Sequence, residues 1–103
     1  MSERKLAQTV TVTNPQGLHL RVASRIAQCA GQFEAKIEVI KNNERVDGKG
    51  AVQLITLGAG QGTVLSIEAT GRDAAEALEA LVKLFESGFT EEKQDGPSPE
   101  PPT

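Results

Sequence analysis

The chain has 103 residues and a formal net charge of −3, with one cysteine, one histidine, three phenylalanines and neither tyrosine nor tryptophan. This length predicts one small domain with a single core. One cysteine and one histidine exclude an internal disulfide and any recognisable metal-ligand set, so we expect neither a metal nor another cofactor. No stretch approaches the roughly 20 apolar residues of a membrane span, so we expect a cytoplasmic protein that does not insert into membranes.

The negative charge comes from the last residues of the chain. Residues 90–103 hold one basic and four acidic side chains, which leaves ten of the 11 basic and ten of the 14 acidic side chains in residues 1–89. Four of the five prolines also lie in residues 90–103, so we expect an acidic, disordered tail after a folded domain of residues 1–89. A neutral domain with few aromatic rings argues against nucleic-acid binding.

Three elements are predicted in the first part of the chain. Residues 6–13 alternate threonine with valine, which indicates a strand with one buried face. Residues 20–30 place apolar side chains at spacings of three and four, which predicts a helix, and Gly31 follows where a left-handed C-terminal residue is favoured. Residues 33–39 alternate apolar with charged side chains and predict a second strand.

The next part of the chain predicts two strands and a short helix. Asn42-Asn43 predicts a turn into a short antiparallel strand at 44–47. Residues 51–57 have helical spacing but are too few to be stable without packing on the rest of the domain. Residues 58–62 contain three glycines and precede a strand at 63–69; they lack the lysine and serine or threonine of a phosphate-binding loop, so we expect a plain loop.

A last helix is predicted over the apolar stripe of residues 74–85. Asp73 and Glu76 have the spacing of a capping box at its start, and Gly88 is expected just past its end. The order strand, helix, strand, strand, short helix, strand, helix favours an α+β fold with an antiparallel sheet and the helices on one face.

The only histidine, His19, lies where the first predicted strand leads into the first helix. The first backbone N–H groups of a helix have no intrahelical partner and carry partial positive charge, so they form an anion site. Imidazole is suited to accepting and releasing a group near neutral pH. The amides of Leu20 and Arg21 and the Arg21 guanidinium are therefore predicted to surround a phosphate attached to His19.

Other readings of these side chains remain open at this point. A lone histidine at a helix start is, without further context, more often a capping or solvent-exposed residue. Arg25, one turn farther along, is expected to be ordinary surface charge, and Cys29 is expected to be a small buried residue.

Residues 14–23, Asn-Pro-Gln-Gly-Leu-His-Leu-Arg-Val-Ala, resemble the active-site segment of the histidine-containing phosphocarrier (HPr) family of the phosphoenolpyruvate-dependent phosphotransferase system. The usual form in that family is Gly-Leu-His-Ala-Arg-Pro-Ala. Further similarity in residues 48–64, and in residues 68–71 with the helix after them, extends the resemblance to about residues 6–89. It implies an open-faced sandwich in which a four-stranded antiparallel sheet carries three helices on one face.

The resemblance also implies a function. His19 would accept a phosphoryl group on Nδ1, as a pros-phosphohistidine, from enzyme I and pass it to a downstream acceptor of the enzyme IIA type. The chain would be a monomeric, stoichiometric carrier rather than an enzyme, in a sugar-transport or a nitrogen-type relay. An exposed patch of Leu20, Ala51, Val52 and Ile55 would dock these partners.

Two residues of the active-site segment depart from the family pattern. Val22 replaces the proline, which removes a fixed φ and adds an N–H group. Leu20 replaces an alanine, and it either contacts partners or acts as a hydrophobic staple at the start of the helix. The change at Val22 leaves an alternative open, in which the chain is a regulatory or binding domain of the HPr type that does not transfer phosphate.

Overall fold

The computed structural model describes residues 5–89 of the chain. Its elements are, in order, β1 (Lys5–Thr11), α1 (Leu20–Ala30), β2 (Lys36–Lys41), β3 (Glu44–Asp47), α2 (Ala51–Thr56), β4 (Val64–Thr70) and α3 (Ala74–Glu86). All seven predicted elements are present, and apart from the start of β2 their boundaries lie within two residues of those expected.

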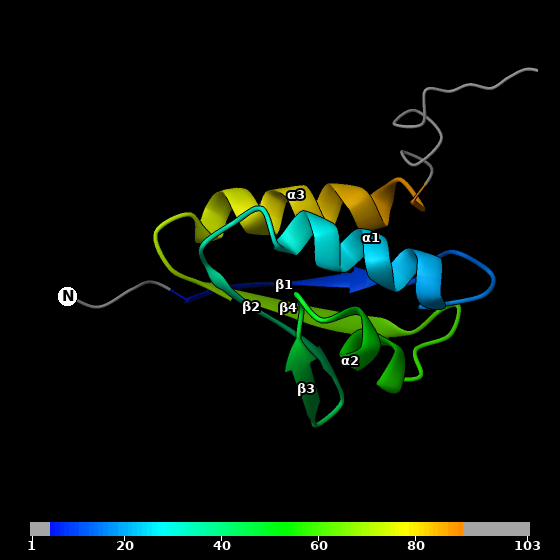
Figure 1. Cartoon of the computed structure of the whole chain (residues 1–103). Coiled ribbons are helices and arrows are strands. Elements are labelled where there is room, and N and C mark those ends of the chain that lie inside the picture. Colours follow the sequence, from blue (N-terminus) through cyan, green and yellow to red (C-terminus); the bar gives the residue numbers. More distant parts are fainter. Residues whose placement is uncertain (1–4, 90–103) are drawn as a thin grey trace, which may run out of the picture.

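The four strands form one antiparallel sheet in the order β1-β4-β2-β3. The helices α1 and α3 lie side by side over one face of this sheet, and α2 packs against α1 near β3 (Figure 1). The predicted α+β sandwich is therefore confirmed. The helix α3 packs against β1. The C-terminal end of α3 and the start of α1 lie at the same end of the molecule (Figure 1).

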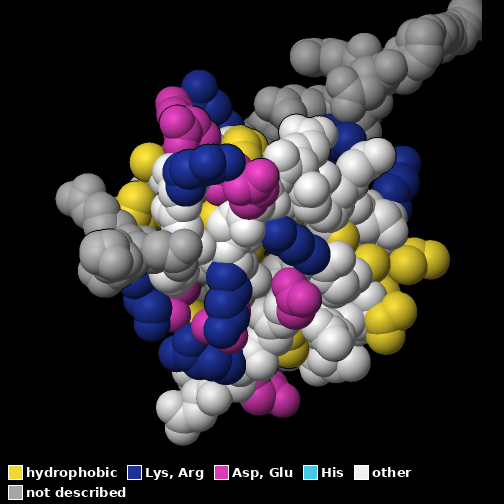
Figure 2. Space-filling view, turned by 60° about the vertical axis from the view of Figure 1, so that its left-hand side comes forward, with side chains coloured by type: hydrophobic (Ala, Val, Ile, Leu, Met, Phe, Trp, Pro, Cys, Tyr) yellow, Lys and Arg dark blue, Asp and Glu magenta, His cyan; other side chains and the backbone are white. Residues whose placement is uncertain are grey.

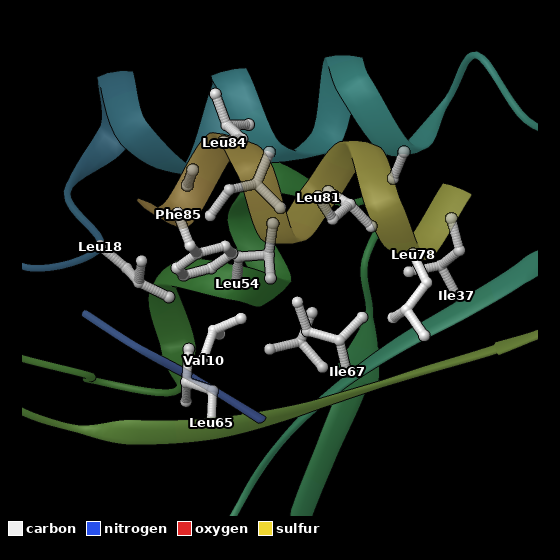
Figure 3. Packing of buried hydrophobic residues seen from close by; sticks show 14 of the residues in the cluster. Val10, Leu18, Ile37, Leu54, Leu65, Ile67, Leu78, Leu81, Leu84 and Phe85 are labelled. Carbon is white, nitrogen blue, oxygen red and sulfur yellow. The ribbon is translucent and has the colours of Figure 1, made fainter. Parts of the chain in front are cut away.

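The core lies between the sheet and the helices. Leu65 and Ile67 alternate along β4 with half-buried polar residues, so the apolar side of the strand faces the helices. Leu54 of α2 and Leu81 and Phe85 of α3 point toward the same space (Figure 3). Burial of a side chain of this size contributes about 1.5–3 kcal/mol relative to its exposure, so the three helices and the sheet are held by one shared core.

The prediction that a strand begins at Phe33 is wrong, because β2 begins at Lys36. The backbone N–H groups of Glu34 and Ala35 donate hydrogen bonds of 2.9 and 2.8 Å to the Asp73 carboxylate instead of joining the sheet. The predicted capping box is wrong for the same reason, since the Asp73 side chain makes no bond to the first turn of α3. Hydrogen bonding, first from the Glu34 N–H and then from that of Ala35, lowers the pKa of Asp73 against the opposing effect of desolvation.

The prediction for Gly31 is also wrong. Gly31 ends α1 with a φ of −67°, in the right-handed region. Gln32 and Phe33 each donate an N–H to the carbonyl three residues earlier, so the chain leaves the helix through tight turns that need no left-handed residue. The predictions for Gly88 and Asn42 are confirmed: Gly88 follows α3 with a φ of 68°, and Asn42 turns the β2–β3 hairpin with a φ of 57°.

Candidate functional site

His19 is the N-cap residue of α1, as predicted. Its backbone is extended, with φ −77° and ψ 177°, and its carbonyl accepts the Ala23 N–H at 2.8 Å, which is the first hydrogen bond of the helix. Its side chain is half-buried and makes no capping hydrogen bond. The imidazole therefore does not cap its own helix, which argues against the alternative that His19 is only a capping residue.

A tight turn delivers the chain to His19. The Gly17 N–H donates to the Asn14 carbonyl at 3.1 Å, and Gly17 has a φ of +69°. The Gly17 carbonyl then accepts two donors, the His19 N–H at 2.9 Å and the side-chain amide of Asn14. The position of His19 thus depends on a turn that begins five residues before it, and sequence analysis did not identify Asn14 as part of the site.

The glycine-rich loop 58–62 packs against this turn. The Leu18 N–H donates to the Ala59 carbonyl at 3.0 Å, and the Leu18 side chain is buried in the core. A Cβ on Gly17 would lie 2.3 Å from the Ala59 oxygen and 2.8 Å from Cα of Gly60, so only glycine fits. The loop leads into β4 rather than into a helix, and it packs directly against the segment before His19.

The first turn of α1 presents N–H groups without intrahelical partners. The amides of Leu20, Arg21 and Val22 precede the first helical hydrogen bond, and this turn holds no acidic residue. These donors and the helix dipole favour a negatively charged group attached to His19. The exposed Arg21 lies on the same turn, where a guanidinium adds charge-assisted hydrogen bonds to a phosphate.

The segments that build the site contain no acidic residue. Residues 12–33 and 48–63 carry Arg21, Arg25 and Lys49 but neither aspartate nor glutamate. Lys49 donates to a backbone carbonyl of the loop before β2, and Arg25 is half-buried beside Gln28 rather than fully surface-exposed. An anion at His19 therefore meets no like charge from these two segments.

Acidic side chains of the described residues lie elsewhere and are often paired. Arg45 donates to Glu38 at 2.7 Å and to Glu68 at 3.0 Å, and Lys5 lies 3.4 Å from Glu68. The hydrogen bond from Arg45 is the main cause that lowers the pKa of Glu68. Figure 2 shows such pairing as dark blue and magenta side chains that lie next to each other on the face in view.

The residues predicted to dock partners, Leu20, Ala51, Val52 and Ile55, lie on two helices that contact each other and are called the docking patch below. Leu20 is 64% exposed, Val52 72% and Ile55 37%, while Ala51 is half-buried. Leu54 points the opposite way and is fully buried, so it anchors α2 while the patch faces outward. The exposure of Leu20 does not fit a hydrophobic staple and suits contact with a partner.

Cys29 and possible metal ligands are the remaining candidates. Cys29 was predicted to be buried, but it is half-buried. Within residues 5–89, no group of three or more histidine, cysteine, aspartate or glutamate side chains is placed to hold a metal ion. Nor does this part of the chain contain a helix that is long and apolar enough to cross a membrane.

Residues 6–87 match the family model described as the phosphorylation site of the phosphotransferase-system HPr component. The chain belongs to the HPr family of phosphocarrier proteins. The HPr of Neisseria meningitidis serogroup A is 41% identical over 86 residues, which cover 84% of this chain and 97% of the relative. The NPr of Shewanella violacea is 32% identical over 87 residues, which cover 84% of this chain and 96% of the relative.

Solved HPr structures have the same architecture. The crystal structure of HPr-C-His from Thermoanaerobacter tengcongensis superposes with a TM-score of 0.79 at 39% identity, over 82% of this chain and 94% of that one. Both the family and the open-faced sandwich predicted from the sequence are therefore confirmed. HPr proteins are phosphocarriers of the phosphotransferase system and not catalytic enzymes, and this general role applies to the chain.

Proposed function

We propose that His19 accepts a phosphoryl group on Nδ1 from enzyme I and donates it to a downstream acceptor of the enzyme IIA type. The observation that carries this proposal is the position of His19 at the N-cap of α1, where the first-turn amides face no acidic residue of that turn. The HPr family is the context in which that position supports phosphoryl transfer rather than helix capping.

The transfer forms a P–N bond at His19 and breaks the bond that held the phosphoryl group on enzyme I. The phosphoryl group leaves enzyme I as its bond to Nδ1 of His19 forms. In a second transfer the bond to Nδ1 breaks as a bond to the downstream acceptor forms. The amides of Leu20 and Arg21, with the Arg21 guanidinium, stabilise the charge on the transferred group. Because these donors are fixed by the helix, they need little reorganisation during the transfer.

Partner proteins dock beside the histidine on the docking patch. Its exposed apolar side chains lie on α1 and α2, so a partner that covers them is brought next to the first turn of α1. Transient signalling and relay complexes use small interfaces of this kind.

The relay ends in sugar transport or in nitrogen-type regulation. HPr and NPr proteins are both among the relatives, at 41% and 32% identity. Transfer from the phosphorylated chain to a sugar-specific IIA protein and to a nitrogen-type IIA protein, measured side by side, distinguishes the two, because the cognate acceptor is expected to be phosphorylated faster.

The alternative, a regulatory domain without transfer, depends on Val22. In the structure Val22 is buried and its N–H lies before the first helical hydrogen bond, so the absence of proline does not interrupt α1. We expect Val22→Pro to preserve or raise the transfer rate if the order of this first turn limits the reaction. A wild-type chain that is folded but never phosphorylated would support the alternative.

A comparison of two arginines tests the proposed phosphate contacts. Arg21→Ala is expected to lower the rate of transfer from enzyme I by about 10-fold to 100-fold, because it removes a charge-assisted partner of the phosphate. Arg25→Ala removes the same charge from the same helix one turn later and is expected to change the rate by less than about twofold. Equal effects of both variants would show that Arg21 acts only through net charge.

A further inference from the structure

Asn14 makes two hydrogen bonds to a single residue of the turn before His19. Its backbone carbonyl accepts the Gly17 N–H, and its side-chain Nδ2 donates to the Gly17 carbonyl. The peptide groups on both sides of Gly17 are thus tied to Asn14. Gly17 needs this restraint because its φ of +69° lies in a region that glycine enters and leaves easily.

The Gly17 carbonyl is also the acceptor for the backbone N–H of His19, at 2.9 Å. Asn14 and His19 therefore share one acceptor, and the direction of that carbonyl fixes the position of the His19 backbone. The Leu18 N–H belongs to the same planar peptide group as this carbonyl and points the opposite way, where it donates to the Ala59 carbonyl at 3.0 Å. The Asn14 side chain donates the side-chain hydrogen bond that this turn receives at the Gly17 carbonyl.

The Asn14 side chain contributes little to stability by itself. Its Oδ1 atom is buried and has no hydrogen-bond partner among the described residues. A buried acceptor without a partner is destabilising by an amount similar to the gain from one hydrogen bond, so the two effects largely cancel. The net effect of the Asn14 side chain on the free energy of unfolding is therefore small, although its hydrogen bond fixes the direction of the Gly17 carbonyl.

We propose that Asn14 is a positioning residue for His19: by orienting the Gly17 carbonyl, it holds the N-cap backbone so that Nδ1 of His19 and the amides of Leu20 and Arg21 act on the same phosphoryl group. This inference rests on the proposed function of His19. Asn14 does not touch the phosphate in this account, and it lies outside the docking patch.

The test uses two substitutions of Asn14 and one control. Asn14→Ala removes the side-chain amide, and Asn14→Asp keeps its shape but replaces the N–H donor by a carboxylate oxygen and adds a negative charge. Both are expected to lower kcat for transfer from phosphorylated enzyme I by about 10-fold, because small displacements of a reacting group are costly, while KM changes less than about twofold. The melting temperature should stay within about 4 °C. Gln16→Ala, which changes an exposed side chain of the same loop, should leave kcat unchanged.

A second measurement does not depend on transfer. Amide hydrogen exchange of Gly17 and His19 is expected to become about 10-fold faster in Asn14→Ala, whereas exchange at Val12, whose N–H bonds to Thr63, should not change. Unchanged kcat in both folded Asn14 variants, or an equal loss in Gln16→Ala, would overturn the role of Asn14. Absence of transfer in the unsubstituted protein would instead overturn the proposed function, even if the exchange pattern is as expected.

Discussion

Gly17 is the most constrained position of the site at the scale of single residues. It combines a positive φ with a backbone contact that leaves no room for a Cβ, since the Ala59 oxygen would lie 2.3 Å away. Gly60 lies in the opposing loop but has no positive φ, and a Cβ there would meet nothing within 4 Å. Glycine is therefore required at position 17 by backbone conformation and packing, whereas neither requires it at position 60.

We expect Gly17→Ala to lower the free energy of unfolding by about 2 kcal/mol or more, because both the backbone and the Ala59 loop would have to shift. Gly60→Ala should change it by less than about 0.5 kcal/mol, or raise it slightly through the unfolded chain. Urea denaturation of both variants measures this difference. If Gly17→Ala is as stable as the wild type, the close packing of the loop against the histidine segment is not maintained in solution.

Single residues with distinctive chemistry could be assigned from the sequence. The residues that hold them in place by hydrogen bonds could not. His19 and Arg21 stand out because their side chains and spacing fit a phosphate site at a helix start. The bonds from Asn14 to Gly17 and from Leu18 to Ala59 leave no such trace. Asparagine before proline indicates only a turn, and a carbonyl acceptor in another loop has no sequence signature at all.

At the scale of elements, the docking patch requires the packing of α1 against α2. Leu20 and Val52 are each more than half exposed, so neither contributes much to the core. Val64 on β4 is exposed to a similar degree, at 59%, but it pairs with Thr11 across the sheet and is not on either helix. It therefore serves as a control with similar chemistry and exposure.

Leu20→Lys and Val52→Lys are each expected to slow transfer from enzyme I several-fold, mainly by raising KM, because a partner would have to bury a charge. Stability should change by about 0.5 kcal/mol, as at ordinary surface positions. Val64→Lys should leave the transfer kinetics unchanged. Equal slowing by all three substitutions would place the docking surface elsewhere, and unfolding of either helix variant would place that residue in the core.

The Asp73 carboxylate joins the start of α3 to the segment before β2. Because its hydrogen bonds lower the pKa of Asp73 in the folded state, its contribution to stability is present above the pKa of the unfolded chain and is lost as the pH falls through the lower folded pKa. Asp73→Ala is expected to lower the melting temperature at pH 7. This difference from wild type should shrink below about pH 4, where aspartate is ordinarily protonated. A difference that stays constant from pH 7 to pH 3 would contradict this role.

The same contact explains why one strand was predicted too early. Residues 33–35 continue the alternation of β2, and a local pattern shows no reason for the strand to begin at Lys36. Their hydrogen-bond acceptor, Asp73, lies 38 and 39 positions farther along the chain. Long, periodic elements such as α1 and α3 were predicted closely because their signal lies within the element itself.

At the scale of the whole molecule, element order predicted the α+β class, and the family resemblance added the open-faced sandwich. The strand order β1-β4-β2-β3 was not predicted, because the pairing of β4 between β1 and β2 joins segments that are distant in sequence. The acidic tail expected at residues 90–103 lies outside the described residues. Within them, the acid-free segments 12–33 and 48–63 come into contact only through folding, between α1 and α2 and between Leu18 and Ala59.

The most direct test of the central claim is phosphorylation of the purified chain by phosphoenolpyruvate and enzyme I, followed by intact mass spectrometry. We expect the gain of one phosphate that is lost in acid and retained in base, as for a phosphoramidate on imidazole, and we expect none in a folded His19→Ala variant. A folded wild-type chain that stays unphosphorylated with several enzyme I preparations, or a His19→Ala variant that still gains phosphate, would contradict the assignment of His19 as the phosphoryl acceptor.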